Sequence, residues 1–209
     1  MDTVRFYFSF RSPYSWLSFY RMNRVIPRLP LEFEFIPCFP PKEFDADPRA
    51  NPAKGEYITA DVARFAEAYG LPLRWPRPFD TDWVRPHAAF VYAQDQGLGR
   101  EFGLAAHAAR FSEGRDIGTD NAIGDIASSC GLNPAATVRA ADERAIHKRV
   151  LKGMEQSRKD GLFGVPFFVY GGQSFMGNDR IEWLLRTIHR DLGKLLPDMQ
   201  DDPFARPYL

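Results

Sequence analysis

Cysteine and histidine are scarce in this chain of 209 residues, and their scarcity limits its chemistry. Cys38 and Cys130 are its two cysteines, far apart in sequence and outside any CxxC motif. A disulfide framework is therefore not expected, and two isolated cysteines are more often core residues than a redox pair. The four histidines show neither HxxxH nor HExxH spacing, so the sequence predicts no metal site.

The chain also lacks an excess of either charge and any long apolar run. Lysine plus arginine and aspartate plus glutamate each number 27, which gives a formal net charge of zero. Without a basic block, nucleic acid is not expected as a partner. No apolar run approaches the roughly 20 residues of a membrane helix, and MDTVR leads into a strand without the layout of a signal peptide. These absences predict a soluble cytoplasmic protein.

What the chain does contain, at its beginning, is a strand, a sharp turn and a helix. Apolar side chains occupy alternate positions from Val4 to Phe10, the period of a strand with one apolar face. The period changes at Ser12, and from Trp16 onward the spacing is helical. Ser12 before Pro13 is a preferred helix start, because serine accepts from exposed amides and proline has none to lose. A helix start also favours an anion, so Ser12 is either a simple cap or a chemical site.

The rest of the chain follows the order strand, helical block, hairpin and helix. A second strand is predicted at residues 31–36, parallel to the first because a helix connects them. Helical patterns that end at glycines fill residues 54–160. The glycine pair at 171–172 joins two short strands, and an apolar helix follows at 181–192. We therefore predict an α/β fold of the order βαβ, helices, ββα.

Two motifs give the chain a family resemblance. The stretches FYFSFRSPYSWL and GLFGVPFFVYGGQSFMGNDRIEWL are similar to the SPYS turn and the GVPxF hairpin of the 2-hydroxychromene-2-carboxylate isomerases and kappa-class glutathione transferases. PAKGEYITADVARFAEAYGLPL is a weaker similarity. The resemblance implies a thioredoxin-like fold of the DsbA/kappa type with a large all-helical insertion. Its thioredoxin-like domain would comprise residues 1–53 and 161–196, the helical insertion 54–160, and the C-terminal tail 197–209.

The resemblance changes the interpretation of Ser12. In redox members of this superfamily the same turn carries CxxC, and the helix start lowers the pKa of the first cysteine. Residues 12–15 are SPYS here, and an alcohol cannot exchange with a disulfide. The family alternative is to bind glutathione, with Ser12 as the catalytic residue that hydrogen-bonds its thiolate. Such a bond contributes about 1.5–3 kcal/mol and a helix start roughly 0.3–1 kcal/mol, which would lower a thiol pKa near ~8.5 by on the order of one to three units.

The same resemblance implies further contacts with glutathione. It implies a cis peptide bond between Val165 and Pro166, which exposes the Val165 main chain for strand-like pairing, although a trans bond is the more frequent form in general. The turn before the last helix offers amides and a carboxylate to the γ-glutamyl end, or merely caps that helix. Its residues are Met176, Gly177, Asn178 and Asp179.

Cations and aromatic side chains complete the predicted pocket. Lys54 matches the family lysine beside the pocket and would bind a carboxylate of glutathione or of an acidic substrate, unless it is only a solvated lysine. Arg11, next to Ser12, either meets an anion or is exposed. The segment FDADPRANPAK lacks the GNKPP-like stretch of family members, so the substrate half of the site is altered. The aromatic residues, each a lining or a core residue, are Tyr14, Trp16, Trp75 and Trp83.

We therefore expect an enzyme that activates the glutathione thiol towards a small organic electrophile. In the isomerases, the thiolate adds to an unsaturated aromatic-derived acid, a bond rotates, and glutathione is released, a step in the catabolism of aromatic compounds. A kappa-like transferase would instead release a thioether and consume glutathione. A third hypothesis is a non-catalytic thioredoxin-like binding module. By resemblance alone, the protein is expected to be a homodimer.

Overall fold

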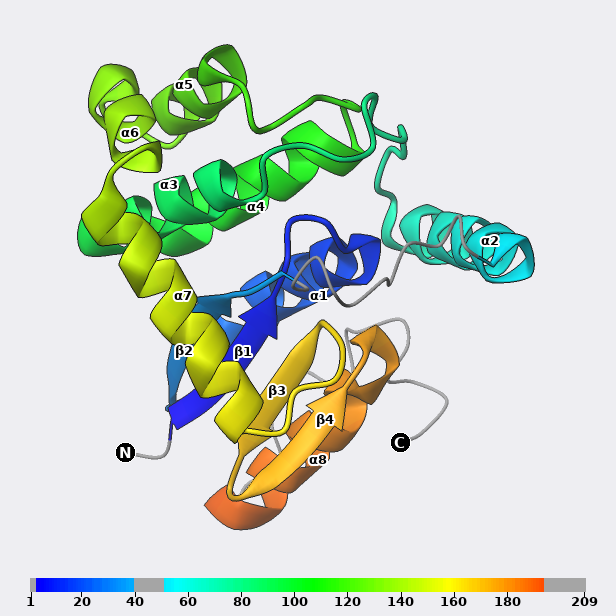
Figure 1. Ribbon diagram of the computed structural model, residues 1–209. Helices are drawn as coiled ribbons and strands as arrows, with labels where there is room; N and C mark the ends of the chain where they lie inside the picture. The colour runs from blue at the N-terminus through cyan, green and yellow to red at the C-terminus, as the bar shows by residue number, and fades with distance from the viewer. Residues whose placement is uncertain (1–2, 40–50, 194–209) are drawn as a thin grey trace.

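A computed structural model describes residues 3–39 and 51–193 (Figure 1). Its elements are β1 (Thr3–Phe8), α1 (Pro13–Val25), η1 (Ile26–Arg28), β2 (Glu32–Pro37), α2 (Pro52–Tyr69), α3 (Val84–Asp95), α4 (Gly99–Phe111), α5 (Asp120–Ser129), α6 (Pro134–Ala141), α7 (Arg144–Lys159), β3 (Phe167–Tyr170), β4 (Gln173–Met176), η3 (Asn178–Arg180) and α8 (Ile181–Leu192). The strands form one sheet in the order β2-β1-β3-β4. β1 is parallel to β2 and antiparallel to β3, which pairs antiparallel with β4. The predicted order βαβ, helices, ββα is confirmed.

One face of the sheet carries an aromatic core beneath α1 and α8. Phe6, Phe8 and Phe168 have no exposed surface. The rings of Phe6 and Phe168 stack with centroids 4.4 Å apart, and Phe19 of α1 meets Phe8 edge-on at 4.8 Å. Full burial of a phenylalanine side chain contributes about 1.5–3 kcal/mol. This layer therefore fixes the start of α1 against the end of β1.

The opposite face of β1, which carries Thr3, Arg5 and Tyr7, is partly buried, which the alternation of apolar residues did not indicate. Tyr7 has no exposed surface and packs with Met154 of α7, which crosses this face (Figure 1). The Tyr7 hydroxyl donates to Asp160, just beyond α7, and Arg5 pairs with the same carboxylate, Nε to Oδ2 at 2.8 Å. Asp160 therefore provides the partner for the polar ends of both Arg5 and Tyr7 on this face.

The helical segment has two parts. Helices α3 to α6 pack together at one end of the sheet and α7 runs down from them, whereas α2 lies apart, near the start of α1 (Figure 1). α2 begins at Pro52, earlier than predicted, because the Asn51 side chain caps it and accepts from the Lys54 N–H at 3.2 Å. None of the helices in residues 3–39 and 51–193 is long and apolar enough to cross a bilayer. An extended loop is predicted at residues 39–52 from their proline and charge content, and most of it, like the tail at 197–209, lies outside the described residues.

Candidate active site

Ser12 lies where β1 has ended and α1 begins. It is the N-cap of α1, as predicted: its Oγ accepts from the Ser15 N–H at 3.2 Å, and Pro13 is the first helical residue. The same hydroxyl donates its proton to the backbone carbonyl of Val165 at 3.3 Å. Ser12 therefore joins the helix start to the segment that precedes β3, and its single hydroxyl proton is directed at the Val165 carbonyl.

Serine hydroxyls also close the turn that precedes Ser12. The Ser9 N–H donates to Ser15 Oγ at 3.2 Å, and the Arg11 N–H donates to Ser9 Oγ at 3.2 Å. Ser9 is 1% exposed and Ser15 is fully buried. Because buried amides must find partners, these serines hold the backbone of the turn in one conformation.

Two buried histidines that the sequence did not indicate support this turn. His87 of α3 accepts the Phe10 N–H at Nε2 (3.2 Å), and its Nδ1 lies 2.5 Å from the Trp83 carbonyl. The accepting Nε2 requires a neutral ring with its proton on Nδ1. His107 of α4 has its Nδ1 2.9 Å from the Gly103 carbonyl. Burial lowers the pKa of His87 to about 4 and that of His107 to about 3, so both rings are neutral near pH 7.

A cavity of about 1160 Å³ opens beside Ser12, between the sheet and α2. Three predicted glutathione-binding residues line it: Ser12, Val165 and Lys54. They come from the start of α1, the segment before β3 and the first turn of α2, which are far apart in the sequence. The Lys54 side chain is exposed at the cavity mouth. The fold therefore brings together a hydroxyl, a backbone carbonyl and a cation.

The cavity wall is mainly apolar and its charges are mainly positive. Of the predicted aromatic residues, Tyr14 and Trp75 line the cavity. Trp16 instead stacks on Phe111 in the core, and Trp83 packs over the buried Arg110 with its ring centroid 4.5 Å away. The other aromatic lining residues are Phe39, Phe79 and Phe163. Among the lining residues that the structure describes, the cations are Arg11, Lys54 and Arg158, and the acidic residue is Glu56.

The turn after β4 lies next to the Val165–Pro166 bond, which is cis as the resemblance implies. The Gly177 N–H donates to the Pro166 carbonyl at 2.9 Å. Gly177 has a φ of +112°, a backbone conformation that favours glycine. Pro166 and Gly177 therefore contact each other beside the cavity, although neither belongs to its lining.

Asn178 and Asp179 have different surroundings. Asn178 is 2% exposed; its Oδ1 accepts from the Ser18 hydroxyl at 3.2 Å, and its Nδ2 donates to the Tyr69 hydroxyl at 3.1 Å. Its side chain thus ties the turn to α1 and α2, which leaves only its main chain for a ligand. The Asp179 side chain is 60% exposed and pairs with Arg180 at 2.7 Å. Its carboxylate remains accessible to an ammonium group.

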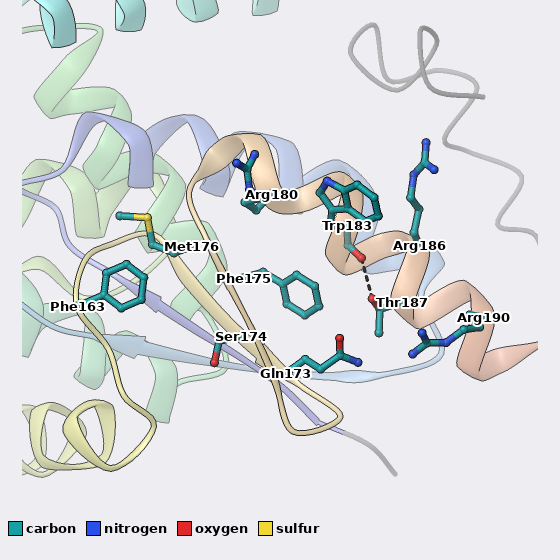
Figure 2. A pocket seen from close by; sticks show the side chains of 10 residues that line it. All are labelled: Phe163, Gln173, Ser174, Phe175, Met176, Arg180, Trp183, Arg186, Thr187 and Arg190. Atoms are coloured by element: carbon teal, nitrogen blue, oxygen red, sulfur yellow. Dashed lines mark hydrogen bonds between the residues drawn. The ribbon is translucent and has the colours of Figure 1, made fainter.

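Met176 belongs to a different cavity, of about 770 Å³, between β4 and α8 (Figure 2). Its side chain is 40% exposed. Figure 2 shows the surrounding aromatic residues and arginines, which come from β4, η3, α8 and the segment before β3. They include Phe163, Phe175, Trp183, Arg180, Arg186 and Arg190. The structure therefore does not bring the Met176 side chain into the cavity that Ser12 lines.

Neither cysteine supplies a reactive thiol at this site. Cys38 lines the cavity of Ser12 but is only 4% exposed, and burial raises its pKa to about 12. Burial also raises the pKa of Cys130, which lies in another part of the molecule. A thiolate is the reactive form of a thiol, and neither cysteine forms one readily at neutral pH. Thiol chemistry at Ser12 therefore needs a thiol from a bound molecule.

The fold and the site define a thioredoxin-like protein with a helical insertion and SPYS at the start of α1. The chain belongs to the DSBA-like thioredoxin domain family, which matches residues 3–189. It is 29% identical over 189 residues to the 2-hydroxychromene-2-carboxylate isomerase of Sphingobium xenophagum, across 87% of this chain and 95% of that protein. It is 22% identical over 197 residues to glutathione S-transferase kappa 2 of Caenorhabditis elegans, across 85% of this chain and 88% of that protein.

A solved structure of a 2-hydroxychromene-2-carboxylate isomerase has the same fold. Its TM-score is 0.80 at 22% identity, and the match covers 91% of this chain and 96% of that one. The predicted thioredoxin-like fold of the DsbA type and the resemblance to these two groups are therefore confirmed. The named relatives are enzymes, which agrees with the expectation of an enzyme rather than a binding module.

Proposed function

We propose that this protein is a glutathione-dependent isomerase of the 2-hydroxychromene-2-carboxylate isomerase type. One observation carries the proposal: the Ser12 hydroxyl, at the start of α1, lines a large cavity whose cysteine is buried and unreactive. Glutathione would supply the nucleophilic thiolate for reversible addition to an unsaturated, aromatic-derived substrate. The names of the relatives support this chemistry. We further propose a homodimer in the reducing cytoplasm, by resemblance.

The residues around Ser12 fit a bound thiolate without a separate base. The Ser12 oxygen is held by the Ser15 N–H, so its proton can turn from the Val165 carbonyl towards a sulfur atom beside it. The helix start adds a favourable potential for negative charge. Because Ser12 keeps its own proton, no histidine is needed. His87 could not serve as one, since its Nε2 already accepts the Phe10 N–H.

The remaining contacts extend along the tripeptide. Val165 would pair through its main chain with the peptide of glutathione, supported by Pro166. Lys54 would bind the carboxylate of the glycine end. The main chain around Asn178 and the exposed Asp179 carboxylate suit the two charges of the γ-glutamyl end. Gly177 and Met176 would contribute backbone only, because the Met176 side chain lies in the other cavity.

The test measures the pKa of the bound thiol from its ultraviolet thiolate absorbance as a function of pH. In the native protein we expect this pKa to lie about one to three units below that of free glutathione. In Ser12→Ala, the pKa of the bound thiol should rise back by most of that difference. Ser157→Ala is the matched control, because Ser157 lines the same cavity but donates to the Met154 carbonyl at 2.8 Å. An unchanged thiol pKa in Ser12→Ala contradicts the activation scheme.

Two measurements separate the alternatives. A kappa-like transferase consumes glutathione in proportion to product, whereas the isomerase leaves its concentration constant. A binding module without affinity for glutathione would keep its melting temperature in saturating glutathione. A binder at 100 times its dissociation constant gains about 2.7 kcal/mol and melts at a higher temperature.

A further inference from the structure

Arg11 lies directly before Ser12 and lines the same cavity. Its side chain is only 18% exposed, unlike those of Lys54 and Arg158, which are exposed. Its Nε donates to Asp80 Oδ1 at 3.1 Å. Within the described residues, no hydrogen bond or ion pair engages its two terminal nitrogens. The guanidinium therefore presents its outer pair of N–H donors in a fixed position.

The position of Arg11 is set by a second, buried arginine. Arg110 has no exposed surface, and its Nη2 donates to the Phe79 carbonyl at 2.6 Å. This bond holds the segment that carries Asp80, the partner of Arg11. The Phe79 ring lies near both guanidinium groups, at 5.8 Å from Arg11 and 5.5 Å from Arg110. The side chain of Arg11 is thus ordered before any ligand arrives, which reduces the entropy lost on binding.

The surroundings of Arg11 indicate the ligand. Phe79, Trp75 and Tyr14 line the same cavity, so an aromatic ring finds apolar contacts there. The free edge of a guanidinium matches a planar carboxylate through two parallel N–H···O bonds, a geometry that lysine does not offer. Arg11 is also the cation nearest in sequence to Ser12, where the thiol would react. A carboxylate held there would orient the rest of the molecule towards Ser12.

We propose that Arg11 binds the carboxylate of an aromatic co-substrate and thereby selects carboxylate-bearing electrophiles over neutral ones. The inference rests on the proposed function for the identity of the reaction, but it concerns a different ligand from glutathione. Lys54, on α2, is left to glutathione. Arg11 is a specificity residue in this scheme, and Asp80 positions it.

The experiment is calorimetric titration of the glutathione-saturated, full-length protein with 2-naphthoate and, separately, with its neutral isostere 2-naphthamide. The native protein should prefer naphthoate. Arg11→Gln should weaken naphthoate binding by about 10- to 100-fold, the range for a lost bond to a charged group, and change naphthamide binding by less than about threefold. The naphthoate affinity of Arg11→Lys should lie between those of the native protein and Arg11→Gln, because lysine keeps the charge and loses the paired N–H donors of the guanidinium. Arg158→Gln is the matched control and should leave the preference intact.

Three results would overturn the proposal. Naphthoate affinity could be unchanged in Arg11→Gln, both probes could weaken equally, or glutathione itself could weaken more than naphthoate, which would assign Arg11 to the cofactor. Titrating the two probes into protein without glutathione separates the Arg11 carboxylate site from the proposed glutathione-dependent function. Absence of heat with glutathione contradicts the proposed function, whereas an Arg11-dependent preference for naphthoate in the same protein still supports the carboxylate site.

Discussion

Two of the walls of the Ser12 cavity differ in construction. The first wall is the end of β1 with the start of α1, and α1 buries seven of its thirteen residues. Ser9, Ser15 and His87 anchor its turn from within. The second wall is α2, where only Val62 and Ala66 are buried among eighteen residues. One wall is part of the core and the other rests on it.

The difference matches a division of labour between the two halves of the site. A thiolate needs donors that are already in place, because reorganisation at the moment of reaction would cancel their benefit. The buried wall offers such donors at Ser12. An exposed helix tolerates changes of side chain at little cost in stability, so α2 is the wall whose side chains can vary without loss of the fold. The following predictions test whether the walls really differ in this way.

Truncation of one phenylalanine in each wall should give the largest contrast. Phe8 has no exposed surface and meets Phe19 and Phe90 at 4.8 Å each, so Phe8→Ala should lower the free energy of unfolding by about 3–5 kcal/mol. Phe65 of α2 is half-buried, and Phe65→Ala should cost less than about 2 kcal/mol. Urea unfolding measures both. Equal losses would mean that α2 is as integral to the core as β1.

Acid should weaken the buried wall through its histidines. Their pKa values are lowered to about 4 for His87 and about 3 for His107, against about 6.5 in an unfolded chain. The unfolded chain therefore binds protons that the native protein does not, and stability falls as the pH drops from about 6.5 to 4. Each histidine contributes at most about 1.4 kcal/mol per pH unit, or about 3 kcal/mol for His87 over this range.

A single substitution isolates one of these histidines. The ring of His107 lies among Phe8, Phe10 and Phe19, and a phenyl ring of similar size would keep these contacts. His107→Phe should therefore keep the stability at pH 7 within about 1 kcal/mol and remove roughly half of the loss between pH 6.5 and 4. Urea unfolding at several pH values measures the slope. The same slope in the variant and the native protein would contradict the assignment.

Local chemistry made much of the fold predictable. The hairpin follows from Gly171 and Gly172, whose φ values of +55° and +73° are those that glycine adopts without strain. The last helix has the predicted bounds, because its apolar face is regular over Ile181–Leu192. The burial of Tyr7 could not be predicted, because it depends on α7 and on Asp160, which lies 153 positions further along the chain. A strand pattern describes the strand and does not reveal what packs on it.

The site shows the same limit. Ser12 and Val165 came from two local motifs, and the fold brings them within hydrogen-bond distance. The contact of Arg11 with Asp80 spans 69 positions and that of Phe10 with His87 spans 77. No short motif marks either pair, because each side chain is ordinary in its own segment. The residues proposed to contact the ligand were therefore easier to predict than the residues that position them.

The smallest predicted effect concerns the tether between the two walls. The Tyr14 hydroxyl donates to Asp61 Oδ2 of α2 at 2.8 Å, and burial together with this bond raises the pKa of Tyr14, which keeps the phenol neutral. Tyr14→Phe removes the bond and should cost about 0.5–1.5 kcal/mol. Because α2 has few other buried contacts, the loss should appear as faster hydrogen exchange in α2, with α1 unchanged.

Tyr57→Phe provides the matched control for this last variant, because Tyr57 also belongs to α2 but is 61% exposed. Its hydrogen exchange should equal that of the native protein. If Tyr14→Phe accelerates exchange in α1 and α2 alike, the two walls open as one unit. The distinction between a fixed wall at Ser12 and an adjustable wall at α2 would then have no basis in the stability of the fold.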